Sequence, residues 1–152
     1  MPRFTFRLAA VLRQRERVEE EKKLLLAAAQ RKLYEAEMER KGLQDRREAL
    51  ARELVEEHTK LDGETLRMTY AHLDFLAREI TAADWRVNAA AVSVEQAREI
   101  LVRASQQRKI LERLRDKQHE TFKLEQMRLE HRDLDEANSR RHAAAVREGV
   151  SP

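Results

Sequence analysis

The stretch Thr59-Lys60-Leu61-Asp62-Gly63-Glu64 is the one place where two very long helical patterns can reverse direction. Asp62-Gly63 is a turn dipeptide, because glycine adopts the left-handed conformation that ends a helix without steric cost. The Asp62 carboxylate can cap the amides that begin the next helix. A reversal here predicts an antiparallel hairpin of two helices.

The composition favours an all-α protein. The 152 residues include only three Gly and two Pro, and 39% of them are Asp, Glu, Lys or Arg. Such a chain is nearly all helix. Alanine inflates the hydrophobic content and aromatic residues make up 5%, so the apolar side chains form a thin seam and no thick core. We expect a single coiled-coil domain over residues 1–152.

The sequence also argues against several classes of protein. There is no cysteine, which rules out disulfides and thiolate zinc sites. No run approaches the roughly 20 apolar residues of a membrane span, and the N-terminus lacks the apolar core of a secretory signal. A net charge of +3 with both signs interleaved is weak support for a polyanion partner. These features predict a soluble cytoplasmic protein.

The first arm is predicted to be helical from about residue 5 to 61, with Thr5 as its N-cap. Apolar residues recur every seven positions at Phe4, Val11, Val18 and Leu25, which is a coiled-coil seam. A second register then runs from Leu26 to Leu61. Leu24-Leu25-Leu26 is therefore predicted to change the phase of the seam.

The second arm is predicted to be helical from about residue 64 to 147, after a turn at 62–63. Its seam is Leu66, Tyr70, Leu73, Ala77, Ile80, Val87, Ala91, Val94 and Leu101. Thr81-Ala82-Ala83-Asp84 resembles a helix cap, so a kink near Trp85 and a continuous helix both remain open. Gly149 and Pro152 mark the end of helical structure.

Folding at Asp62-Gly63 places residue i near residue 125 minus i. The rule brings Ala27-Ala28-Ala29 and Ala36 opposite the region from Ala89 to Ala97, which predicts a waist of small residues. The second arm is the longer one, so its C-terminal end must overhang. From about Phe122 onward, Met127, Leu129 and Leu134 are apolar residues without a predicted partner.

Both ends of the chain carry a recognisable pattern. Near the C-terminus, residues 110–123 read Ile-Leu-Glu-Arg-Leu-Arg-Asp-Lys-Gln-His-Glu-Thr-Phe-Lys, and a later stretch ends in Leu134-Asp-Glu-Ala137. Near the N-terminus, residues 4–8 read Phe-Thr-Phe-Arg-Leu, followed by Val11-Leu12 and Arg15-Glu16. Together these resemble the flagellar type III export stalk protein family, FliJ, over essentially the whole sequence.

This resemblance implies a coiled coil similar to the central gamma stalk of rotary ATPases. It implies that the end with both termini binds and stimulates the hexameric export ATPase, through Leu8, Val11, Leu12, Arg15, Leu129, Leu134, Asp135 and Glu136. It further implies contact with the export gate membrane protein through Tyr70, Leu73 and Ile80, although these three also fit the seam. The expected location is the cytoplasmic face of the inner membrane at the flagellar base, and escort of export chaperones or substrates remains open.

Nothing in the sequence indicates catalysis. There is no phosphate-binding loop, catalytic triad or metal-ligand spacing among the five His residues, so we expect no enzyme activity, cofactor or metal. We expect a monomer when alone. Three alternatives remain: an injectisome stalk, a parallel dimeric scaffold, and a basic nucleic-acid-binding arm. The cations of that arm would be Arg98, Arg103, Arg108, Lys109, Arg113, Arg115 and Lys117.

Overall fold

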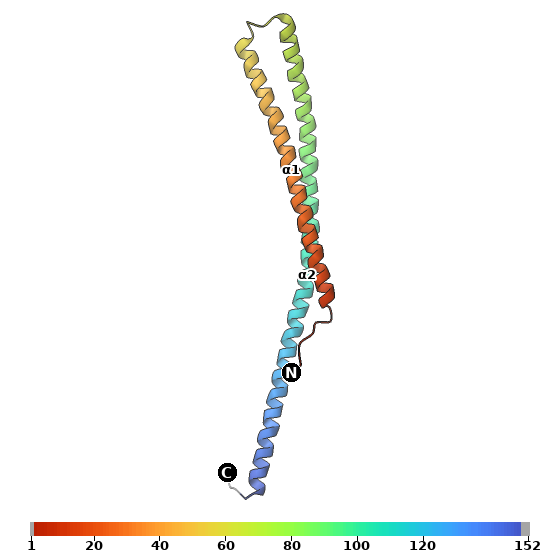
Figure 1. Cartoon of the computed structure of the whole chain (residues 1–152), viewed down its shortest axis with the longest axis vertical. Helices are drawn as coiled ribbons and strands as arrows, with labels where there is room; N and C mark the ends of the chain where they lie inside the picture. The colour runs from red at the N-terminus through yellow and green to blue at the C-terminus, as the bar shows by residue number, and fades with distance from the viewer. Residues whose placement is uncertain (1, 150–152) are drawn as a thin grey trace. The chain divides into compact units, whose positions relative to one another are not determined.

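The computed structural model describes residues 2–149, which contain two helices (Figure 1). Helix α1 spans Ala9–Glu57 and helix α2 spans Gly63–Arg147. The two helices pack against each other, and the described residues contain no strand, so the prediction of an all-α helical hairpin is confirmed.

The chain divides into two compact units. The turn unit comprises residues 17–105 and includes the connection between the helices. The terminal unit comprises residues up to 16 and from 106 onward. Each unit is considered by itself below, and the single domain over residues 1–152 stays a prediction.

In the turn unit, the covered residues of α1 follow one alternating spacing of three and four. They include Glu19, Lys22, Leu26, Ala29, Leu33, Ala36, Arg40, Leu43, Leu50 and Leu54. This confirms the register predicted after Leu26. The predicted phase change at Leu24-Leu25-Leu26 is wrong, because Leu24 and Leu25 are exposed and Glu19 and Lys22 continue the same seam. Long charged side chains can occupy such positions by packing their aliphatic stems against the partner helix.

The seam of α2 in the turn unit has the same spacing. Its covered residues include Leu66, Thr69, Leu73, Leu76, Ile80, Ala83, Val87, Ala90, Val94, Ala97, Leu101 and Ala104. The seam residues predicted at seven-residue intervals from Leu66 to Leu101 are all confirmed. Tyr70 was predicted in the seam and is instead exposed, because Thr69 takes the seam position.

Two ion pairs between the helices show which residues of α1 and α2 lie opposite each other within the turn unit. Arg86 Nη2 lies 3.1 Å from Glu39 Oε1, and Arg40 Nη1 lies 3.5 Å from Asp84 Oδ1. The first pair obeys the 125 minus i rule and the second is one position away from it. The antiparallel register predicted from the turn is therefore confirmed here. Because partly exposed ion pairs contribute little net stability, the apolar seam holds the helices together.

The small residues of the predicted waist are only partly covered. Ala27 and Ala28 are exposed, whereas Ala29 and Ala36 are half-buried. The most enclosed small residue is Ala83 on α2, whose exposed fraction is 0% and which lies outside the predicted waist.

Two roles were predicted for residues of the connection between the helices, and one of them is confirmed. The amide of Thr65 donates a hydrogen bond to Asp62 Oδ1 at 2.8 Å, so Asp62 caps α2 as expected. Gly63 was expected to end a helix in the left-handed conformation, but it is the first residue of α2. Among the described residues only Gly149 has a positive φ, of 71°, and it ends α2 as predicted. Pro152 lies outside the described residues.

We expect substitution of Asp62 to have a pH-dependent effect. Hydrogen bonds from the side chain and amide of Thr65 hold the pKa of Asp62 below its ordinary value of 3.8. A lowered pKa stabilises the fold above the unfolded-state value, and this stabilisation is lost as pH falls through the folded-state pKa. Asp62→Ala should therefore lower the melting temperature at pH 7 and have little effect in stronger acid. Asp62→Asn retains a capping oxygen without a titrating charge and is the control; equal effects of Asp62→Ala at both pH values would contradict the prediction.

Helix α2 is unbroken around Trp85, where a kink was one alternative. Thr81 Oγ1 donates to the carbonyl oxygen of Ala77 at 3.1 Å, which is a bond made inside a helix and not at a cap. The cap interpretation of Thr81 is therefore wrong. The Trp85 side chain is 73% exposed, so it does not pack in the seam.

We expect Gly42→Ala to stabilise the protein by about 1 kcal/mol. Gly42 lies within α1, and a methyl group added there would meet no atom within 4 Å. Glycine in a helix interior costs about 1 kcal/mol relative to alanine, mainly through backbone entropy. Thermal unfolding followed by circular dichroism measures the change. A lower melting temperature would show that close approach of the helices requires Gly42.

The terminal unit begins with a non-helical segment, residues 2–8, called here the N-terminal segment. Thr5 was predicted to cap a helix, but α1 starts at Ala9, whose amide bonds to the Phe6 carbonyl at 3.1 Å. Phe6 is buried, and the Phe4 ring centroid lies 4.9 Å from that of His119 on α2. Burying large apolar side chains contributes about 1.5–3 kcal/mol each, which explains why the segment packs on α2 and does not extend α1.

Candidate partner-binding surfaces

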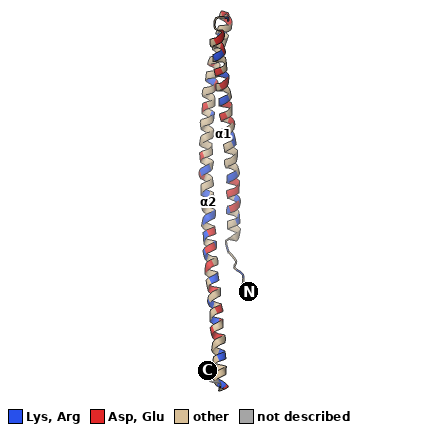
Figure 2. Ribbon diagram, turned by 90° about the vertical axis from the view of Figure 1, so that its left-hand side faces the viewer, with Lys and Arg blue, Asp and Glu red and all other residues tan. Residues whose placement is uncertain are grey.

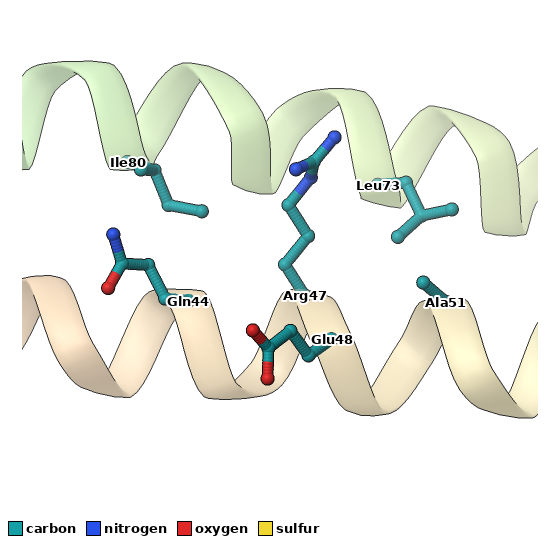
Figure 3. Close-up of a pocket in the computed structure, with 6 residues that line it drawn as sticks. All are labelled: Gln44, Arg47, Glu48, Ala51, Leu73 and Ile80. Carbon is teal, nitrogen blue, oxygen red and sulfur yellow. The ribbon is translucent and has the colours of Figure 1, made fainter.

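A hollow of about 550 Å³ opens between α1 and α2 of the turn unit (Figure 3). Arg47 occupies a position at which the seam spacing calls for an apolar residue, and its side chain extends toward α2 (Figure 3). Ala51, one turn further along α1, is short. Together these residues leave the helices incompletely packed. The lining residues are Gln44, Arg47, Glu48, Ala51, Leu73 and Ile80.

The three residues expected at the export gate do not form one surface. Leu73 and Ile80 line the hollow from α2 (Figure 3) and are half-buried. The seam interpretation is therefore confirmed for these two residues. Tyr70 is exposed outside the seam. A partner can reach Tyr70 directly, and can reach Leu73 and Ile80 only through the hollow.

Two neighbours of Tyr70 were missed by sequence reasoning. Met68 and Phe75 are also large, exposed apolar residues on α2. The His72 ring stacks on Phe75, with ring centroids 6.2 Å apart and planes inclined by 14°. The sequence could have indicated that these two residues are exposed, because they do not fit the seam spacing. An apolar residue off the seam of a coiled coil has no partner within the hairpin.

The N-terminal residues expected at the ATPase differ in accessibility. Leu8 and Val11 are exposed, whereas Leu12 is only 4% exposed and belongs to the core. Arg15 Nη1 donates a hydrogen bond to Gln107 Oε1 on α2 at 2.7 Å, which holds the first turns of α1 against α2. Leu8 and Val11 are therefore the accessible members of this group, and Leu12 is not.

The C-terminal residues expected at the ATPase are all exposed. Leu129, Leu134, Asp135 and Glu136 lie in a stretch from residue 127 to 149 in which only Ala137 and Ala145 are partly covered. Leu129 and Leu134 are five residues apart, which places them about 140° apart around the helix. They therefore face different directions and cannot form one stripe.

Sequence reasoning overlooked a more regular stripe in the same stretch. Leu124, Met127, His131 and Leu134 are spaced by three, four and three residues, and all four are exposed. Such spacing places side chains on one helix face and is typical of a surface that packs against another helix. We call these four residues the C-terminal stripe. The sequence alone contained this signal, because the spacing is visible without coordinates.

The structure does not bring the two groups of expected ATPase residues together. The N-terminal segment packs on α2 around His119 and Phe122, and Glu125 is the furthest α2 residue lining the hollow beside it. Leu129 and Leu134 lie beyond that point along α2. A partner must therefore contact the two groups separately.

Charges of both signs are distributed along both helices (Figure 2). Many pair within one helix, as Glu136 does with Arg140 at 3.9 Å. Within residues 2–149 no cluster of His, Cys, Asp or Glu could hold a metal ion. The same residues include no helix that is long and apolar enough to span a membrane.

A seam of paired helices with exposed apolar residues outside it is the structure of a coiled-coil protein. A family model described as flagellar FliJ protein matches residues 4–147. The chain therefore belongs to the flagellar FliJ protein family, whose members are non-catalytic components of flagellar export. No curated protein and no solved structure matches the chain.

Proposed function

We propose that this protein is a stalk that binds the hexameric export ATPase and stimulates its ATP hydrolysis. The observation that supports this proposal is the C-terminal stripe, a helix-packing face that is exposed in the isolated chain. Large exposed apolar surfaces of a monomer commonly mark interaction sites. Leu8 and Val11, together with Leu129, Asp135 and Glu136, would add further contacts.

The turn unit would contact the export gate membrane protein. Met68 and Phe75, seven residues apart, share one face of α2, and Tyr70 is exposed on another face. Exposed aromatic and Met side chains of this kind are enriched at the centres of protein interfaces. The hollow beside Leu73 and Ile80 could receive a side chain of the partner. These two contacts would place the protein at the cytoplasmic face of the inner membrane, and escort of export chaperones or substrates could accompany them.

The test of this proposal is the rate of ATP hydrolysis by the purified export ATPase with and without this protein, at physiological salt. We expect faster hydrolysis at substoichiometric amounts, near one chain per hexamer. Unchanged hydrolysis together with no co-sedimentation would contradict the proposal.

The alternatives are less well supported by the structure. A parallel dimeric scaffold would use the seam that α1 and α2 of one chain already fill. The cations of a nucleic-acid-binding arm are partly neutralised, since Arg98 pairs with Glu95 and Arg108 with Glu112, both at 2.7 Å. The family match is to a flagellar and not an injectisome protein.

A further inference from the structure

The N-terminal segment and α2 together line an open, shallow hollow of about 610 Å³ in the terminal unit, called here the terminal hollow. Its floor is apolar and includes Phe4, Leu114 and Phe122, whose rings or branched side chains are only half-buried. Phe4 is held in place by ring contacts with His119 at 4.9 Å and Phe122 at 5.7 Å. The remaining lining residues are Arg3, Thr5, Lys117, Gln118, Thr121 and Glu125.

The surroundings of the terminal hollow are strongly basic. Residues 2–13 carry three arginines and no carboxylate, and residues 106–123 carry six Lys or Arg against three Asp or Glu. Two of those three carboxylates are engaged, Glu112 by Arg108 at 2.7 Å and Asp116 by Arg115 at 3.3 Å. The positive charge therefore exceeds what nearby carboxylates can neutralise.

Seven of these cations are exposed, and within the described residues none of them forms an ion pair. They are Arg3, Arg7, Arg13, Lys109, Arg113, Lys117 and Lys123. Arg3 and Lys117 lie at the terminal hollow itself, one on the N-terminal segment and one on α2. At ordinary salt such a cluster attracts negatively charged groups over about 10 Å, which favours an acidic partner.

We propose that the terminal hollow binds an acidic peptide segment of a partner protein that carries one large apolar side chain. The apolar side chain would enter between Phe4, Leu114 and Phe122. Carboxylates beside it would meet Arg3 and Lys117, and Gln118 and the hydroxyls of Thr5 and Thr121 could bond to its backbone. Glu125 at the edge of the hollow would repel a carboxylate there, which limits the acidic residues to the side of Arg3 and Lys117. This site is distinct from the residues proposed to bind the ATPase.

The apolar floor favours a peptide over other anionic partners. A membrane headgroup or a nucleic-acid phosphate offers negative charge but no compact apolar side chain for the floor. Single-stranded nucleic acid would need aromatic faces on which successive bases stack, whereas the Phe4 ring already contacts His119 and Phe122. Vesicles and oligonucleotides are therefore competitors in the test.

The test uses the full chain and a fluorescein-labelled peptide of about 12 residues, rich in Asp and Glu, with one central Phe. Fluorescence anisotropy would measure its affinity at low salt and at higher salt. We expect binding that weakens by about tenfold or more as salt rises, since screening shortens the reach of the cations. A peptide with Phe replaced by Ser, and one with Lys in place of the acids, should bind at least several-fold more weakly.

Three variants locate the binding. Arg3→Glu with Lys117→Glu should weaken peptide binding by about tenfold or more, because both attractions become repulsions. Arg46→Glu with Arg67→Glu changes the charge equally at exposed positions of the turn unit and should leave binding unchanged. Phe4→Ala should also weaken binding, with helicity retained, because it removes part of the floor.

Several results would overturn this inference. These are no measurable binding of the acidic Phe peptide, equal loss in both charge variants, or tighter binding of phosphatidylglycerol vesicles or oligo(dT) than of the peptide. Since no ATPase is present in this assay, these outcomes are independent of ATPase stimulation. A protein that stimulates the ATPase but fails here would retain the proposed function and lose only the terminal hollow as a site.

Discussion

Replacing Leu129 and Leu134 together by Glu weakens binding to the export ATPase by about 100-fold or more, while the helical content of the protein is unchanged. A leucine side chain that becomes fully buried contributes about 1.5–3 kcal/mol, and each 1.4 kcal/mol is a factor of ten in affinity. Placing a carboxylate in an apolar interface adds a further cost. Both leucines are exposed in the isolated chain, so the substitutions remove no packing from the fold. Co-sedimentation with the ATPase measures the loss, and circular dichroism measures the helicity.

The control is a matched double substitution elsewhere on the chain. Leu24 and Leu25 are also exposed leucines, but they lie in the turn unit. Leu24→Glu with Leu25→Glu should leave ATPase binding intact. Equal loss in both double variants would show that the effect is unspecific, and a collapse of helicity in the first would show that its leucines belong to the fold.

Substituting Ala83 by Leu destabilises the hairpin by about 1–3 kcal/mol. Ala83 has no exposed surface and occupies a seam position of α2. Extra methylene groups in a closely packed core force side chains off their preferred rotamers or push the backbones apart. Thermal or urea unfolding at neutral pH measures the loss.

The matched control for this change is Ala28→Leu. Ala28 is exposed, although the sequence placed it in the waist, so the larger side chain points into solvent. Exposed substitutions usually change stability by less than about 0.5 kcal/mol. If Ala83→Leu and Ala28→Leu were equally tolerated, the seam assigned to α2 would be incorrect.

The sequence was sufficient to predict the seam and the pairing. Leucine, isoleucine and valine at seven-residue intervals, from Leu66 to Leu101, fix which face of α2 is covered. The position of Asp62 then fixes which residues meet, as the Glu39–Arg86 ion pair shows. Both signals are local, because periodicity and turn chemistry depend on neighbouring residues only.

Other features depended on contacts that no local pattern reveals. Thr5 is a plausible helix cap, but Phe4 contacts His119 of α2 and Phe6 is buried, and this packing overrides the local preference. Glu19 and Lys22 occupy seam positions although their types suggest solvent exposure. A pattern of apolar residues alone therefore predicted a phase change of the seam, and the structure contains no such change.

The accessibility of the candidate surface residues did not follow from the sequence. Family resemblance selected Leu12 and Ile80, which the hairpin itself covers. The exposed apolar residues of these regions include Met68, Phe75 and Met127 instead. A resemblance suggests regions of the chain, but only packing within the chain determines which side chains of a region remain exposed.

The most direct test of the two-partner account is photo-crosslinking in motile cells from two positions of the chain. A photoreactive amino acid would replace Leu134 in one strain and Tyr70 in the other, both of which are exposed. We predict that position 134 captures the export ATPase and that position 70 captures the export gate membrane protein. Capture of the ATPase from position 70, or of the gate from position 134, would contradict the account.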